Sequence, residues 1–178
     1  KENEEQKQKI KKLKDYVKRK QKKIDIIKIL NEKHIGISLQ EWLKSIEITG
    51  QELNILFDTN FETAMEIIII NKLHMKNGVI MAFNEKKNTL YVQKESWGEL
   101  NMIDFKKIII NIQRGLILSF SKWSETLSER EKYNDNKCFL ERQRKVLGGC
   151  NIEKTIQKLY KKIYAELSKN INEYKIMF

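Results

Sequence analysis

Basic side chains gather in three stretches of this 178-residue chain, and the chemistry they offer is phosphate binding. One stretch lies within residues 1–23, one is a lysine pair in mid-chain, and one lies near residue 144. Lysine and arginine hydrogen-bond to phosphate oxygens and release the counterions around a nucleic acid. The residues expected to make such contacts are Lys12, Lys18, Arg19, Lys20, Lys22, Lys23, Lys86, Lys87, Arg142, Arg144 and Lys145.

The position of the charge along the chain is more informative than its total of +11. Residues 1–23 contain 11 basic and 4 acidic side chains, residues 24–128 contain 12 and 13, and residues 129–178 contain 12 and 7. Lysine outnumbers arginine by 30 to 5, a bias typical of AT-rich coding, so codon usage accounts for some of the basic charge. We expect a near-neutral middle with two basic ends.

Sequence motifs of catalysis and metal binding are absent from the chain. It has no Walker loop, no Gly-x-Ser-x-Gly elbow and no His-Glu-x-x-His helix. His34 and His74 are expected at helix ends, in structural or solvent-facing roles. Cys138 and Cys150 lack the spacing of a zinc site, so reduced thiols are expected. The sequence predicts a protein that is not an enzyme and binds no metal or cofactor.

Membrane and secretion signals are also absent. No apolar run approaches the roughly 20 residues of a membrane span, and the first residues are charged, unlike a signal peptide. We therefore expect a soluble intracellular protein without a membrane partner, located in the cytoplasm, or in the nucleus if it is eukaryotic.

The pattern of apolar residues predicts a mainly helical α+β protein. Residues 1–23 have apolar residues three and four apart, which predicts an amphipathic helix that is either a basic binding arm or a solvated charged helix leading into the domain. A second helix is expected from Ile24 to about Gly36. Ser38 and Thr49 each have a glutamate three residues later, which is the form of a capping box. Two helix starts this close predict a two-turn helix, a tight turn near Ile48 and a second helix.

A further helix and a β-hairpin are expected next. The segment TNFETAMEIIIINKLHMKNG is expected to turn Phe61, Met65, Ile68 and Ile69 inward, although its β-branched run at Ile67–Ile70 would also suit a strand. In GVIMAFNEKKNTLYV, apolar residues alternate on both sides of a polar turn, which predicts two paired strands.

Residues 24–93 resemble the winged-helix superfamily, with ISLQEWLKSIEITGQEL as the helix-turn-helix and GVIMAFNEKKNTLYV as the wing. The resemblance implies groove binding, with Gln51 and Asn54 placed to read bases and Lys86 and Lys87 at the wing tip. The candidate recognition helix has acidic residues and no lysine or arginine, which disfavours specific reading of the major groove. The layout also resembles winged helices that bind proteins, such as those of PCI and DDRGK proteins.

A third interpretation comes from residues 78–112, GVIMAFNEKKNTLYVQKESWGELNMIDFKKIIINI. Their hairpin, loop and helix are similar to the C-terminal half of class I type III secretion chaperones, which dimerise and wrap unfolded effectors. The three-stranded first half expected of those chaperones is not evident between Ile24 and Phe57.

The last part of the chain predicts two more helices. A polar linker, SEREKYNDNK, precedes a short basic helix, CFLERQRKVLGG, ended by two glycines. Asn151 is expected to cap the final helix, which has an apolar stripe that either packs on the domain or forms a homodimer surface. Residues 37–42 are echoed at 118–123 around Trp42 and Trp123, which suggests two related helical units and two core tryptophans.

These observations predict a basic arm at 1–23, a winged-helix-like core at 24–128 and a basic helical extension at 129–178. The expected function is non-enzymatic nucleic-acid binding, most naturally to DNA in its maintenance, replication or transcription, through the basic arms and the wing. The alternatives are a protein-interaction module or scaffold and, third, a chaperone-like dimer.

Overall fold

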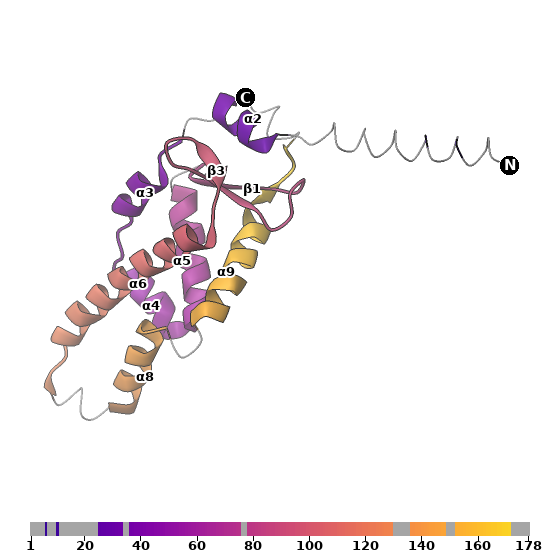
Figure 1. Ribbon diagram of the computed structural model, residues 1–178. Coiled ribbons are helices and arrows are strands. Elements are labelled where there is room, and N and C mark those ends of the chain that lie inside the picture. The colour runs from indigo at the N-terminus through magenta and orange to yellow at the C-terminus, as the bar shows by residue number, and fades with distance from the viewer. Residues whose placement is uncertain are drawn as a thin grey trace.

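A computed structural model (Figure 1) describes residues 6, 10, 25–33, 36–75, 78–129, 136–148 and 152–171. As the sequence predicts, the protein is mainly helical with a small sheet. The helices are α2 (Ile26–Lys33), α3 (Leu39–Ser45), α4 (Gly50–Asp58), α5 (Phe61–Met75), α6 (Met102–Glu125), α8 (Asn136–Val146) and α9 (Ile152–Leu167). The strands are β1 (Ile80–Phe83), β2 (Leu90–Gln93), β3 (Trp97–Glu99) and β4 (Ser168–Lys169).

The predicted hairpin is confirmed and forms the centre of a four-stranded sheet. The strand order is β3-β2-β1-β4, with β1 and β2 antiparallel and Met81 opposite Tyr91. Strand β4 runs parallel to β1, so the end of helix α9 leads directly into the sheet. The turn between β1 and β2 includes Asn88 at φ 54°, a left-handed conformation that asparagine tolerates better than most residues.

Both faces of the hairpin are covered by other parts of the described fold. On one face, Ile80, Ala82, Leu90 and Val92 join the main helical core. On the other face, side chains of the sheet pack against α2 and against Ile171, which lies two residues after β4. This second cluster consists of Ile26, Leu30, Phe83, Tyr91, Trp97 and Ile171. The hairpin is therefore an internal element that joins two layers of the core.

Both predicted capping boxes are present. Ser38 Oγ accepts a hydrogen bond from Glu41 N at 3.2 Å, and the Glu41 carboxylate accepts one from Ser38 N at 2.9 Å. Thr49 and Glu52 make the same reciprocal arrangement at the start of α4. These caps satisfy N–H groups that have no partner inside the helix, and they fix where α3 and α4 begin.

Helix α5 continues through the β-branched run that would also suit a strand. Ala64, Met65, Ile68 and Ile69 are fully buried, and α5 packs against α4 and α9. Burial on several sides of a helix favours bulky apolar residues whatever their intrinsic preference, so packing overrides the strand tendency of isoleucine here.

The C-terminal helices belong to the same core as the middle of the chain. Val146 of α8 and the α9 residues Ile156, Leu159 and Ile163 are buried in the main cluster. The predicted apolar stripe of α9 is thus covered within the chain. Asn151, the expected cap of this helix, lies outside the described residues.

The sequence echo does not correspond to one repeated local structure. Residues 37–42 cross from an extended loop into α3, whereas residues 118–123 lie inside the 24-residue helix α6. Trp42 is fully buried, as expected of a core anchor. Trp123 is partly buried and packs at the edge of the core.

Candidate nucleic-acid interface

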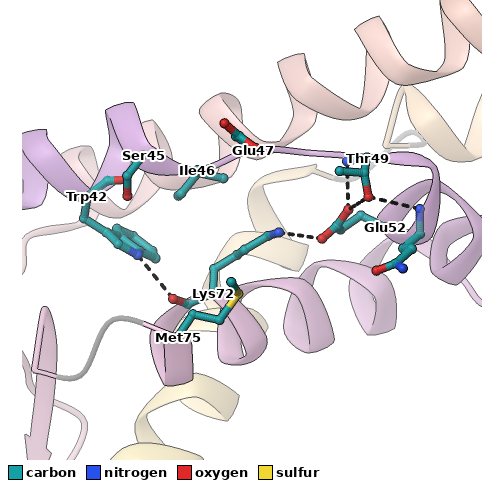
Figure 2. A pocket seen from close by; sticks show the side chains of 9 residues that line it. Trp42, Ser45, Ile46, Glu47, Thr49, Glu52, Lys72 and Met75 are labelled. Carbon is teal, nitrogen blue, oxygen red and sulfur yellow. Dashed lines mark hydrogen bonds and ion pairs between the residues drawn. The ribbon is translucent and has the colours of Figure 1, made fainter.

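The predicted helix-turn-helix is held to α5 by one ion pair, shown in Figure 2. Glu52 Oε2 accepts hydrogen bonds from Thr49 N at 2.8 Å and Thr49 Oγ1 at 2.6 Å. Its other oxygen, Oε1, lies 2.5 Å from Lys72 Nζ on α5. The Glu52 and Lys72 side chains are only 12% and 14% exposed, so this pair is shielded from water.

The environment keeps Glu52 ionised. Burial alone would raise the pKa of its carboxyl group, but the hydrogen bonds from Lys72 and Thr49 outweigh burial and lower the pKa to about 2. Trp42 Nε1 also donates to Lys72 O at 3.4 Å, so α3, α4 and α5 meet at one point. A hollow of about 300 Å³ lies beside this pair. Since the charges already satisfy each other, the arrangement fixes the helices and offers no charge to a ligand.

The two predicted base-reading residues lie on the exposed side of α4. Gln51 lines the small hollow beside Glu52. Asn54 lines a separate, open groove of about 810 Å³ between α4, the α3–α4 connection and α6. Both amides are exposed. They are three residues apart on the helix, so α4 presents them to solvent at neighbouring positions.

The floor of this groove depends on a close approach between the α3–α4 connection and α6. A Cβ added at Gly115 of α6 would lie 2.5 Å from Cγ1 and 2.8 Å from Cβ of Ile48. Only glycine lets Ile48 sit this near to the backbone of α6. The predicted tight turn near Ile48 is therefore packed against α6, the longest helix among the described residues.

The lysine pair at the hairpin tip is only partly available. Lys86 Nζ pairs with the Glu99 carboxylate at the end of β3. Lys87 is exposed, and none of the described residues forms an ion pair with it. The tip therefore presents one uncompensated lysine instead of the two expected.

The basic cluster of α8 is largely used inside the protein. The Arg142 guanidinium lies over the rings of Phe57 and Trp123, with centroid distances of 4.7 and 5.1 Å. Lys145 Nζ donates to Phe57 O at 2.5 Å, near the C-terminal end of α4, where helix carbonyls need partners. Of the three α8 residues predicted to bind phosphate, Arg144 alone is exposed and makes no ion pair with the described part of the chain.

The structure does not bring these basic residues together. Figure 1 shows α8 and the sheet at opposite ends of the molecule, so Arg144 and the hairpin tip do not share a strip. The predicted contacts of the arm, from Lys12 to Lys23, lie outside the described residues. On α9, Lys158 and Lys162 form ion pairs with acidic residues of α5. Basic side chains of α9 therefore also pair with acidic groups of the same chain.

Sequence reasoning missed a second feature of α6. Ile103, Ile110 and Ile117 are exposed on its outer face, in addition to the apolar residues that the helix buries. The available signal was the seven-residue spacing of these isoleucines beside an already complete inner stripe.

Other chemistry is not supported by the described residues. Among them, no group of three or more His, Cys, Asp or Glu side chains is placed to hold a metal ion. No helix in the described ranges is both long enough and apolar enough to cross a membrane. Comparison with known proteins gave no matching family model, no matching curated protein and no matching solved structure.

Proposed function

We propose that this protein binds nucleic acid without catalysing a reaction, and that residues 1–23 supply most of the phosphate contacts. One observation supports this more than any other, namely the separation of charge along the chain. Residues 1–23 contain 11 basic and 4 acidic side chains, whereas residues 24–128 contain 12 and 13. A dense run of positive charge binds the phosphate backbone by releasing counterions.

The part of the chain that the structure describes has a supporting role in this proposal. Arg142 and Lys145 are engaged with Phe57 and Trp123, and Lys86 is paired with Glu99. Lys87, Arg144 and the two amides of α4 remain exposed for additional contacts. Because α4 has acidic residues and no basic ones, binding should depend strongly on salt and only weakly on base sequence.

The test is a salt series with an AT-rich duplex and two variants of the full chain. In the first variant, Lys18, Arg19, Lys20, Lys22 and Lys23 are replaced by Gln. The matched control replaces five exposed lysines elsewhere by Gln, namely Lys33, Lys44, Lys137, Lys154 and Lys161. Each phosphate contact contributes about 0.9 to the slope of log K against log salt concentration, so the first variant should have a slope smaller by several units.

The control separates local contacts from net charge, since both variants lose five positive charges. The proposal requires the control to keep most of the slope and affinity of the unmodified chain. Equal losses in the two variants would indicate a diffuse charge effect. Binding by the unmodified chain no tighter than roughly 10⁻⁴ M, the weak end of non-specific association, would refute nucleic-acid binding.

A further inference from the structure

The outer face of α6 has a row of isoleucines that the described fold does not use. Ile103, Ile110 and Ile117 lie seven residues apart and are 69%, 44% and 40% exposed. The opposite face of the same helix already supplies a full set of core residues, Phe105, Ile108, Ile109, Ile112, Leu116 and Phe120. A helix with apolar residues on two faces is typical of a helix covered on both sides in its working assembly.

Basic residues alternate with the isoleucines along this face. The order Ile103, Lys107, Ile110, Arg114, Ile117 has spacings of four and three, which on an α-helix confines all five to an arc of about 80°. The row is roughly 21 Å long at about 1.5 Å per residue. Lys107 pairs with Asp104 at 2.9 Å and is still 62% exposed, and Arg114 forms no ion pair with any described residue. We call these five residues the α6 strip.

We propose that the α6 strip is a docking site for an amphipathic helix of another protein, with an apolar seam flanked by acidic side chains. Apolar residues seven apart recur at one of the two heptad positions through which helices pack along their length. Glutamate or aspartate beside the seam of the incoming helix would complement Lys107 and Arg114, which favours encounter and sets orientation. This site goes beyond the nucleic-acid binding proposed above.

The charges of the strip argue against two other occupants. A second copy paired through α6 would place Lys107 and Arg114 opposite the same residues of its partner, and like charges at close range are unfavourable. Residues 1–23 are themselves strongly basic, so their composition does not complement the strip. Phosphate groups would match its charge, but they would leave the three isoleucines exposed to water.

The experiment is a selection with the full chain as target and a displayed library of helical 21-residue peptides as probe. The library randomises the seam and its flanking positions. The site is tested with Ile110→Ser/Ile117→Ser, and the matched control is Met75→Ser/Leu147→Ser, which changes two exposed apolar residues outside the strip. Far-UV circular dichroism and urea unfolding verify that both variants keep the fold.

The proposal predicts that enriched peptides have an apolar seam and an excess of Glu and Asp beside it. Their affinity should fall roughly tenfold or more, about 1.4 kcal/mol, for the strip variant and stay unchanged for the control. Reversing the charge on both the strip and the peptides tests the proposed charge complementarity separately. Arg114→Glu should weaken binding of the acidic peptides and strengthen binding of versions in which their Glu residues are replaced by Lys.

Several results would overturn the proposal. One is the absence of any enriched peptide, or an enrichment of basic flanks. Another is equal affinity for the strip variant and the unmodified chain. A dimer of the unmodified chain in sedimentation equilibrium, dissociated by Ile110→Ser/Ile117→Ser, would assign the strip to a second copy. A loss of duplex affinity in the same variant, with peptides displaced by duplex, would assign it to nucleic acid.

Discussion

Helices α6 and α8 make opposite use of side chains that look suited to binding. On α8, Arg142 lies over Phe57 and Trp123, and Lys145 donates to Phe57 O, so basic residues hold the helix in place. On α6, isoleucines that look suited to a core lie exposed on the outer face. The comparison teaches that residue type does not decide whether a side chain serves folding or binding, because its neighbours in space do.

The difference has a physical origin in what each helix packs against. Helix α8 meets the C-terminal end of α4, where unpaired carbonyls and an aromatic cluster of Phe57, Phe120, Trp123 and Phe139 attract cationic groups. Helix α6 crosses the core along its inner face only, so its outer face has no described neighbour to cover it.

The largest expected effect separates the two faces of α6. Ile112→Ala should lower the free energy of unfolding by about 3 kcal/mol, because Ile112 is fully buried and its loss leaves a cavity. Ile110→Ala, two residues away, should lower it by less than about 1 kcal/mol. Urea unfolding of both variants measures the difference. Similar losses would show that the outer face also supports the fold, and the comparison would fail.

The next effect concerns the charged pair that fixes α4. Glu52→Gln should lower the free energy of unfolding at pH 7 by about 2–3 kcal/mol, because it leaves Lys72 shielded without its partner. The folded-state pKa of Glu52, about 2, is below its ordinary value of 4.5. The carboxylate therefore stabilises the fold above pH 4.5, and this contribution is lost as pH falls from 4.5 towards 2.

Urea unfolding between pH 7 and pH 2 measures this contribution. The Glu52→Gln variant should show a smaller decrease in stability across the acid range than the unmodified chain. Glu32→Gln is the matched control, since its partner Lys28 is 3.8 Å away and both side chains are well exposed. It should change stability by no more than about 0.5 kcal/mol. An equal pH dependence with and without Glu52 would contradict its assigned role.

A smaller effect distinguishes two arginines of α8. Arg142→Gln should lower the free energy of unfolding by about 1 kcal/mol, because the variant loses the cation–π contacts of the guanidinium with the rings of Phe57 and Trp123. Arg144→Gln should leave it within about 0.5 kcal/mol, because this side chain is exposed. Thermal unfolding of the two variants in parallel gives the comparison. A larger loss for Arg144 would reverse the assignment of the two roles.

The smallest effect lies at the hairpin tip. Lys86→Gln should change stability by no more than about 0.5 kcal/mol, because its pair with Glu99 is about half exposed. It should also change the salt slope of duplex binding by less than the value of about 0.9 for one phosphate contact. A decrease of about one unit in the salt slope of this variant would show that Lys86 breaks its pair with Glu99 and contacts phosphate.

Local signals in the sequence predicted much of the fold. The capping boxes at Ser38 and Thr49 and the hairpin around its polar turn depend on neighbours a few residues away, and all three are present. The cover on both faces of the hairpin was not predictable in this way. It depends on α2 and on the segment that ends in β4, which are far away in sequence.

The candidate site was less predictable for the same reason. A count of basic residues near position 144 cannot tell that Arg142 meets Phe57, which is 85 residues earlier. The pairing of Lys86 with Glu99 likewise depends on β3 folding back beside β2. The seven-residue spacing of the α6 isoleucines is visible in the sequence, but their exposure depends on which face of that helix the core covers.

We propose that the basic residues in the described part of the chain mainly support the fold, and that residues 1–23 bind nucleic acid. The most direct test measures urea unfolding and the salt slope of duplex binding on Arg142→Gln/Lys145→Gln and on the five-Gln variant of Lys18–Lys23. We predict that the α8 variant unfolds at lower urea with an unchanged slope, and that the arm variant has a smaller slope. An α8 variant that keeps its stability but loses slope and affinity would contradict the account.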